Sequence, residues 1–208
     1  MESSTTPQTT PHRLTDRKRI AIVGAAIEEF LAAGYDATSM DRIAARANVS
    51  KRTVYNHFPS KEALFAAILH QLWDASQDGD APAYRADTPL RAQLLDLLER
   101  KLRLLHDESF LSLARVAIAA GIHSPERARD MVARMGEREE DLTGWVRAAA
   151  ADGRIKTDDP VFAALQLQVL VKGFAFWPQV AMGQVPLGAN EQKRIAEAAA
   201  DMFLALYA

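Results

Sequence analysis

The stretch TSMDRIAARANVSKRTVYNHFPSK, residues 38–61, decides the fold of this chain. Its first half carries apolar residues at the three-and-four spacing that gives a helix one buried face. These residues are Met40, Ile43, Ala44 and Ala47. The second half carries a second short helical pattern, rich in cationic and hydroxyl side chains. The stretch therefore predicts two short helices joined by a tight turn.

The ends of both predicted helices have recognisable signals. Thr38 is the expected cap of the first helix, with Asp41 three residues later to complete a capping box. Asn48 tolerates the left-handed backbone conformation that commonly ends a helix. Ser50 is a suitable cap for the second helix. Ser60, directly after a proline, is expected to cap a further helix.

The second predicted helix separates an inner face from a polar outer surface. Val54 and Phe58 lie four residues apart and mark the inner face. The residues left on the other faces are Lys51, Arg52, Thr53, Tyr55, Asn56 and His57. This is the layout of a helix-turn-helix, whose second helix enters the major groove of DNA.

The local charge also favours DNA as a partner. One acidic residue, Asp41, stands against a larger set of cations within residues 38–61. The cations are Arg42, Arg46, Lys51, Arg52 and Lys61. The whole chain has 25 basic and 27 acidic residues and a net charge of −2, so the basic character is local. An ordinary solvated helix face is the alternative interpretation, and charge alone does not choose between the two.

This segment resembles the N-terminal domain of TetR-family transcriptional regulators. The matching residues are Gly34-Tyr35, Thr38-Ser39-Met40, Ile43-Ala44, Ala47, Val49-Ser50, Thr53-Val54-Tyr55, His57-Phe58 and Ser60-Lys61-Glu62-Ala63-Leu64. They are ungapped and cover residues 15–65. Asn48 departs from the pattern, because many relatives carry glycine there. Asn tolerates the same backbone conformation, so the departure does not threaten the fold.

The helix signals along the chain predict an all-α protein of about nine helices, and the composition is consistent with this class. The chain has 208 residues, of which 49% are hydrophobic, enough for one or two small domains. It has no cysteine, which excludes disulfides and thiolate sites. Residues 1–12 are polar, without the apolar run of a signal peptide, so we expect a cytoplasmic protein. We expect residues 1–14 to form a disordered arm.

The helix signals divide the chain into a helix-turn-helix domain, residues 15–80, and a second domain, residues 81–208. The first helix is expected to begin near Thr15 and end at Gly34, and a polar break follows at residues 78–82. Beyond it, three dipeptides pair a cap residue with proline and mark helix starts: Thr88-Pro89, Ser124-Pro125 and Asp159-Pro160. Gly121 and Gly153 are expected stops, and Asn190 the cap of a final helix, residues 191–207.

The second domain has no pattern typical of catalysis. His106 and His123 are isolated, and neither has a second ligand at metal-binding spacing. The acidic cluster Glu137, Glu139, Glu140 and Asp141 is better explained as a solvated helix face than as a metal or acid–base site. Glycine-rich nucleotide motifs are absent from the sequence. We therefore predict no enzyme activity, no catalytic residues, no metal site and no cofactor.

The helix expected over residues 159–182 is mostly apolar and is predicted to be buried on most sides. It is too short and too polar to span a membrane. Gln166 and Gln168 lie about 200° apart around the axis. We expect one face to line a ligand cavity and the other to pack against a second subunit. The predicted ligand-binding residues are His106, Phe110, Phe162, Gln166, Phe174 and Trp177. Core packing is the alternative for these aromatics.

The family resemblance implies a mechanism. TetR-like regulators commonly dimerise through their last two long helices, here residues 159–182 and 191–207. The segment Gly-Phe-Ala-Phe-Trp-Pro-Gln, residues 173–179, resembles the C-terminal domain of the AefR-like group. The expected protein is a homodimer that binds a pseudo-palindromic site on double-stranded DNA and represses transcription. A small-molecule effector, apolar or aromatic with one or two polar groups, would release it.

The residues expected to contact DNA are Thr38, Ser39, Lys51, Arg52, Thr53, Tyr55, His57 and Lys61. Arg52 is the predicted reader of guanine, because arginine pairs well with guanine O6 and N7. Tyr55, His57 and Lys61 match family positions that usually contact phosphate. Two other classes of function stay open: a ligand-sequestering protein with a vestigial helix-turn-helix, and an enzyme that uses the apolar cavity.

Overall fold

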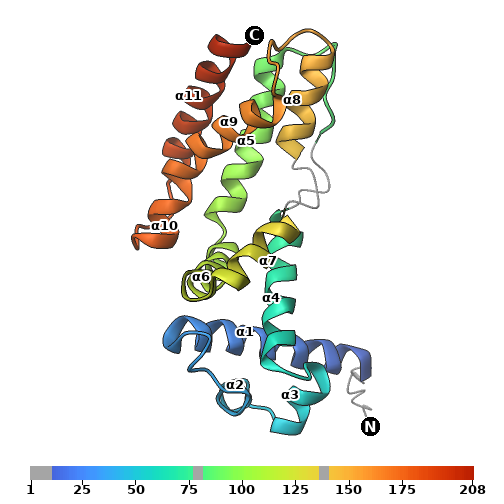
Figure 1. Ribbon diagram of the computed structural model, residues 1–208, viewed down its shortest axis with the longest axis vertical. Coiled ribbons are helices and arrows are strands. Elements are labelled where there is room, and N and C mark those ends of the chain that lie inside the picture. The colour runs from blue at the N-terminus through green and yellow to red at the C-terminus, as the bar shows by residue number, and fades with distance from the viewer. Residues whose placement is uncertain (1–10, 77–81, 136–140) are drawn as a thin grey trace, which may run out of the picture. The chain divides into compact units, whose positions relative to one another are not determined.

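The structure, a computed structural model, describes residues 11–76, 82–135 and 141–208 (Figure 1). The described residues form 11 helices and no strand. The predicted all-α class is therefore confirmed, while the predicted number of about nine helices is too low. The chain forms two compact units, one ending at His70 and one beginning at Gln71. The predicted disordered arm falls mostly on residues 1–10, and the predicted domain boundary at residue 80 on residues 77–81, both outside the described residues.

The first unit contains the predicted helix-turn-helix. Its helices are α1 (Pro11–Ala33), α2 (Met40–Arg46), α3 (Lys51–His57) and α4 (Lys61–Ser76), the last continuing past the division at His70. The first helix begins at Pro11, earlier than the predicted start near Thr15. Its core is built from the fully buried side chains of Ile22, Ala26, Ile43, Val54, Leu64 and Ile68. Each of the four helices contributes to this core, so α2 and α3 are held by apolar packing.

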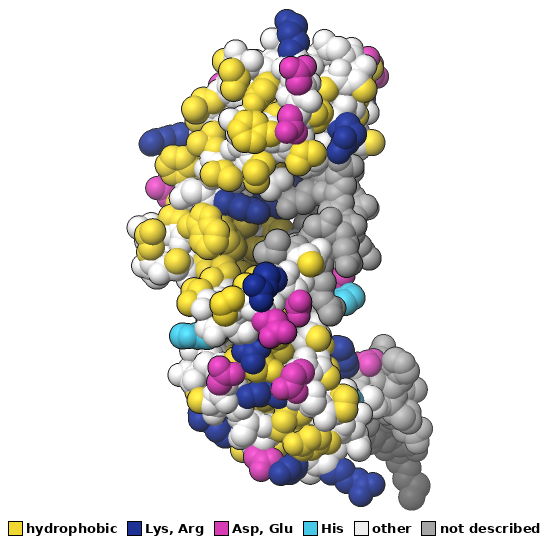
Figure 2. All heavy atoms as spheres, in the orientation of Figure 1, with side chains coloured by type: hydrophobic (Ala, Val, Ile, Leu, Met, Phe, Trp, Pro, Cys, Tyr) yellow, Lys and Arg dark blue, Asp and Glu magenta, His cyan; other side chains and the backbone are white. Residues whose placement is uncertain are grey.

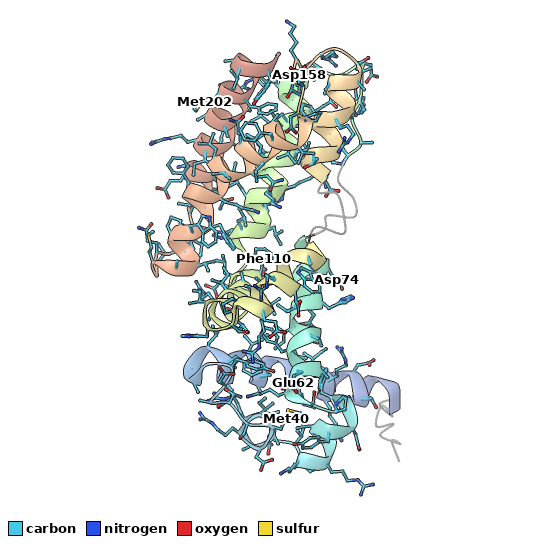
Figure 3. The ribbon with its side chains drawn as sticks, in the orientation of Figure 1. Met40, Glu62, Asp74, Phe110, Asp158 and Met202 are labelled. Atoms are coloured by element: carbon cyan, nitrogen blue, oxygen red, sulfur yellow. The ribbon has the colours of Figure 1, made fainter. Side chains whose placement is uncertain are left out.

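An aromatic cluster connects α1, the following turn and α4. The ring centroids of Phe30 and Tyr35 lie 5.3 Å apart, and that of Phe65 lies 5.0 Å from Tyr35 and 6.0 Å from Phe30. The Tyr35 hydroxyl donates to Glu62, labelled in Figure 3, at 3.3 Å. Gly34 ends α1 with φ 81°, a conformation that suits glycine. The turn that precedes α2 is thus fixed from both sides.

The turn between α2 and α3 has the predicted left-handed residue. Asn48 has φ 52°, the only positive value among the described non-glycine residues. The Asn48 N–H donates to the Ala45 carbonyl at 3.2 Å, and the Val49 N–H donates to the Ala44 carbonyl at 3.1 Å. This pair of bonds is the Schellman pattern, which satisfies the last carbonyls of a helix. The prediction for Asn48 is confirmed.

Beyond α4, the described residues of the second unit form seven helices. Their bounds are α5 (Leu90–His106), α6 (Glu108–His123), α7 (Pro125–Met135), α8 (Asp141–Ala151), α9 (Pro160–Ala175), α10 (Trp177–Ala181) and α11 (Ala189–Tyr207). Helix α5 packs against α6, α9 and α11, and α9 also packs against α8 and α11 (Figure 1). None of the described helices is long and apolar enough to cross a membrane.

Two unpredicted breaks account for part of the larger helix number. Asp107 interrupts the segment between Leu90 and His123: it ends α5, and its carboxylate accepts from the Phe110 N–H at 2.7 Å to begin α6. Phe176 separates α9 from α10, just before Pro178, which cannot donate to the preceding turn. The helix predicted over residues 159–182 is therefore two helices.

The structure also tests the predicted boundaries at Gly121, Gly153 and Asn190. Gly121 does not end a helix: α6 continues to His123, and a Cβ at Gly121 would lie 3.5 Å from the Ala128 Cβ, so the glycine lies where α7 packs closely. Asn190 lies inside α11, which begins after Gly188. Gly153 has φ 74° and follows the end of α8 as predicted.

Candidate nucleic-acid interface

Local capping and packing fix the orientation of α3. The Ser50 Oγ accepts from the Thr53 N–H at 3.1 Å, which confirms Ser50 as the cap. Val54 is fully buried and Phe58 nearly so, which confirms the predicted inner face. Because Lys51, Arg52 and Tyr55 lie on the other faces, they are exposed. The helix therefore presents its cationic first turn to the surroundings.

The five cations of residues 38–61 differ in whether their charged groups already have partners in the structure. In the first unit, Lys and Arg side chains are mixed with carboxylates on the face drawn in Figure 2. Arg46 Nε donates to Glu29 Oε1 at 2.6 Å, and Arg46 Nη1 to Glu28 Oε2 at 2.9 Å. Arg42 Nη2 lies 2.8 Å from Glu29 Oε2. Both arginines therefore connect α2 to α1.

Glu29 is the centre of this ion-pair network. Its side chain is buried, and a buried carboxylate is tolerated when it is paired and hydrogen-bonded. The hydrogen bond from Arg46 lowers the pKa of Glu29 below its ordinary value, with help from the charge of Arg42, against the opposing effect of burial. The same bond raises the pKa of Arg46. Glu29 thus remains charged and stabilises the contact between α1 and α2.

Lys51 also has an acidic partner. Its Nζ lies 2.8 Å from Asp41 Oδ1 and 3.0 Å from Oδ2. The hydrogen bond with Asp41 raises the pKa of Lys51. Both side chains are well exposed, so this pair links α2 to α3 without being removed from solvent. Lys51 is exposed, so a DNA phosphate can replace Asp41 as the partner of its ammonium.

The Lys61 side chain forms hydrogen bonds within the first unit. Its ammonium donates to the carbonyl oxygens of Tyr35 at 2.7 Å, Thr38 at 3.0 Å and Asp36 at 3.2 Å. An ammonium has three protons, so these bonds occupy all of them. Lys61 therefore holds the turn between α1 and α2, and binding phosphate would require it to give up some of these bonds.

Arg52 is the cation that differs. It is the second residue of α3 and is exposed. Among the described residues, no carboxylate or carbonyl pairs with its guanidinium, in contrast to the four other cations of residues 38–61. An unpaired, exposed guanidinium in the first turn of a recognition helix is well placed to read a base edge. Arg52 keeps its full hydrogen-bonding capacity for a ligand.

The two hydroxyl residues before α2 have separate roles. Ser39, and not Thr38, caps α2: its Oγ accepts from the Arg42 N–H at 3.3 Å. Thr38 is buried, and its Oγ1 lies 2.8 Å from the Gly34 carbonyl oxygen and 3.1 Å from that of Glu29, which share its one proton. The predicted capping box with Asp41 is therefore wrong. Thr38 supports the turn, and its hydroxyl is not presented to a phosphate.

The remaining predicted DNA contacts lie around α3. Tyr55 is 42% exposed, whereas Thr53 and His57 are half-buried. The Thr53 and Ser50 hydroxyl oxygens lie 2.8 Å apart, so Thr53 is partly occupied by the cap. Arg19 of α1 lies over the ring of Phe58, 5.2 Å from its centroid. This contact brings a cation of α1 to the end of α3.

The predicted ligand residues do not form one cluster in the second unit. Phe110 is buried, at the start of α6 (Figure 3), with its ring centroid 6.4 Å from that of Phe176. Trp177 adjoins Phe176 at 5.1 Å and is half-exposed. The others are exposed in the single chain: His106, Phe162, Gln166 and Phe174. Gln166 also accepts from the Tyr207 hydroxyl, which ties α9 to α11.

The sequence did not single out two polar residues that lie where α6 and α10 pack together. Gln179 of α10 is buried, and Arg115 of α6 donates to its backbone carbonyl at 2.9 Å. In the sequence, the aromatic residues are the distinctive feature of residues 173–179, whereas the burial of this glutamine depends on the break at Phe176. Elsewhere in the described chain, no group of three His, Asp or Glu side chains is placed to hold a metal ion.

Known protein families and structures match both parts of the chain. Residues 22–68 match the model of bacterial regulatory proteins of the tetR family, and residues 92–208 match that of the AefR-like transcriptional repressor C-terminal domain. The crystal structure of a TetR family regulator from Pseudomonas syringae pv. tomato DC3000 is 54% identical, with a TM-score of 0.83 over 92% of this chain and 97% of that chain.

Two further relatives extend the comparison. The HTH-type transcriptional regulator RutR of Escherichia coli K12 is 30% identical over 81% of this chain and 79% of its own length. The structure of the flavonoid-responsive regulator FrrA is 30% identical, with a TM-score of 0.67 over 92% of this chain and 97% of that chain. Together with the helix-turn-helix geometry, these matches identify a regulator rather than an enzyme. The chain belongs to the TetR family of DNA-binding transcriptional regulators, with a C-terminal domain of the AefR-like type.

Proposed function

We propose that this regulator represses transcription by binding a pseudo-palindromic operator as a homodimer, and that a small apolar or aromatic ligand releases it. The observation that carries the DNA-binding part is the exposed, unpaired guanidinium of Arg52 in the first turn of α3. Arg52 reads guanine, and Lys51 exchanges Asp41 for DNA. The sugar-phosphate backbone of DNA is contacted or positioned by Ser39, Thr53, Tyr55 and His57.

The dimer forms through α9 and α11. These helices pack side by side and expose apolar side chains that a monomer would leave in water. On α9 these are Val161, Phe162, Leu165 and Val169, each at least half-exposed, and on α11 they are Met202 and Leu206. Figure 2 draws apolar side chains gathered over this part of the second unit. A contiguous exposed apolar face of this kind is typical of a protein–protein interface.

The dimer explains how two recognition helices reach one operator. Two copies of α3 would face successive major grooves about 34 Å apart, or a multiple of that distance. A ligand in the second domain would favour a spacing that no longer fits, within the limit set by its different affinities for the two states. The C-terminal family is described as repressors, which supports repression rather than activation of transcription. The flavonoid response of FrrA supports an aromatic ligand. The protein acts in the cytoplasm, which contains the operator DNA that it binds.

The experiment that tests this proposal is a selection of binding sites from random duplex DNA. The expected result is recovery of an inverted repeat with guanine in each half-site, and a weaker preference for that guanine with Arg52→Ala. Arg103→Ala, a change at an exposed arginine of α5, is the matched control and should recover the same site. Recovery of no motif by the folded wild-type protein at low salt would overturn the proposal.

A further inference from the structure

Gln179 occupies an unusual position at the break between α9 and α10. Only 1% of its surface is exposed. Pro178 has no N–H, so the Phe174 carbonyl loses the donor that a continuous helix would provide. The Gln179 Nε2 donates to that carbonyl at 3.3 Å. The Gln179 side chain therefore supplies the hydrogen-bond donor that the Phe174 carbonyl lacks at the break.

This bond also fixes the orientation of the amide. The Phe174 carbonyl accepts only, so the amide nitrogen must face it and the oxygen must point the other way. That oxygen, Gln179 Oε1, is buried and has no hydrogen-bond partner among the described residues. A buried acceptor without a donor costs free energy, and such an atom commonly marks a place for water, an ion or a ligand.

A cation that bonds the backbone of Gln179 also lacks a full set of partners. Arg115 is half-buried on α6, next to the buried Ala114 and Val116. One nitrogen, Nη2, donates to the Gln179 backbone carbonyl at 2.9 Å. No carboxylate of the described chain pairs with this guanidinium, which has five donors in all. A half-buried guanidinium that lacks an anion is suited to a carboxylate ligand, which it can bind with two parallel bonds.

Two aromatic rings lie where α6 and α10 pack together. Phe176 lies in the same break and packs near the buried Phe110 of α6. The acceptor is the side-chain oxygen of Gln179, and the cation bonds the backbone carbonyl of the same residue, so one small ligand that satisfies both carries its anion and its donor close together. Its apolar part would contact the rings.

We infer that the effector is an aromatic or alicyclic 2-hydroxy carboxylate, whose carboxylate pairs with Arg115 and whose hydroxyl donates to Gln179 Oε1. This inference rests on the proposed function, since it names the chemistry of the ligand that the regulator answers. Arg115 and Gln179 select the polar end of the ligand, and Phe110 and Phe176 contact its ring.

The test uses a panel of 2-hydroxy carboxylates that bear phenyl, indolyl or cyclohexyl groups, each matched with its amide and with the acid that lacks the hydroxyl. The unfolding midpoint of the full-length protein is measured with each compound at millimolar concentration, since a ligand that binds only the folded state raises it. The hydroxy acids should raise the midpoint most, the deoxy acids less, and the neutral amides least.

Two variants assign the effect to residues. Arg115→Met should weaken hydroxy-acid binding by roughly tenfold or more, as expected for a lost charge-assisted bond. Arg115→Lys keeps the charge without the fork and should lose less. Arg103→Met is the control for loss of a positive charge and should bind as the wild type does. The unfolding midpoint of each variant without ligand shows whether it is folded.

The outcomes separate this inference from the proposed function. If no hydroxy acid of the panel raises the midpoint, if the amides act equally, or if folded Arg115→Met keeps full binding, the inference is overturned, whatever the DNA result. If the hydroxy acids bind through Arg115 but do not release the protein from its selected site, the inference on the binding site stands and the coupling in the proposed function fails.

Discussion

The ammonium of Lys61 donates to the carbonyl oxygen of Tyr35 at 2.7 Å and lies 4.5 Å from the centre of the Tyr35 ring. A cation in such a position combines a charge-assisted hydrogen bond with attraction to the aromatic face. It connects the start of α4 to the turn that precedes α2. The family pattern suggests a phosphate contact at this position, but the structure gives the side chain a supporting role as well.

Lys61→Met is therefore expected to destabilise the first unit. Loss of hydrogen bonds from a charged group to three carbonyls should lower the free energy of unfolding by about 1–3 kcal/mol. Urea unfolding followed by circular dichroism measures the change. Lys51→Met removes an exposed lysine whose partner is also exposed, and should leave the midpoint nearly unchanged. Equal effects of the two substitutions would exclude a special role for Lys61.

Arg52→Ala should weaken binding to the preferred operator by about 1–3 kcal/mol and relax discrimination at one base position. Arg52→Lys keeps the charge but loses the planar fork, so it should retain binding to random DNA while losing most of the preference. Fluorescence anisotropy on specific and random duplexes measures both. An equal loss on the two duplexes would mean that Arg52 contacts phosphate and not a base.

Asp41→Asn tests the exchange of partners at Lys51. The carboxylate competes with DNA for this lysine, and its own charge repels phosphate. The variant should bind all DNA more tightly, with a plot of log affinity against log salt that is steeper by up to about one. Asp36→Asn, at an exposed residue in the turn after α1, is the control for charge. Unchanged affinity and slope would indicate that Lys51 and Asp41 stay paired on DNA.

Leu165→Glu tests the dimer surface on α9. A charge in the centre of an apolar interface should convert the dimer to a monomer, measured by light scattering after size exclusion. Operator affinity should fall by roughly a hundredfold or more, because the two half-sites are no longer bound together. Ile122→Glu changes an exposed apolar residue on α6, 74% exposed against 50% for Leu165, and should remain dimeric. If both variants remain dimeric, this surface of α9 is not the dimer interface.

Glu29→Gln should reduce stability in a pH-dependent manner. Arg46 lowers the folded-state pKa of Glu29, so the pairing stabilises the fold above the ordinary pKa of 4.5, and this contribution is lost as the pH falls through the lower folded value. The difference between wild type and variant should therefore be full at neutral pH and shrink in acid. Glu28→Gln, at a 64% exposed residue, should show little of this dependence.

The features that the sequence predicts well are local ones. Ser50, Asn48 and the Val54–Phe58 face follow from bonds and spacings within a few residues, and each is found in the structure. Thr38 and Ser39 are adjacent and chemically alike, so the pattern alone did not show which one caps α2. Asp107, without a neighbouring glycine or proline, gave no signal of a helix break.

The features that could not be predicted depend on the tertiary fold. Glu28 and Glu29 lie outside the basic segment in sequence, yet they pair with two of its five cations. A count of charges within residues 38–61 therefore overstates the cations that are available to DNA. The distinction of Arg52 from its neighbours, and the burial of Gln179, appear only when the helices are assembled.

The left-handed conformation of Asn48 has a consequence for the tolerance of this chain to mutation. The residue is exposed, and an exposed position normally accepts most amino acids. Here only residues that adopt positive φ at low cost, namely glycine, asparagine and aspartate, should be accepted, and β-branched residues should be rejected most strongly. A saturation library scored for DNA binding should therefore give position 48 a substitution profile as narrow as that of a core residue, set by backbone geometry alone.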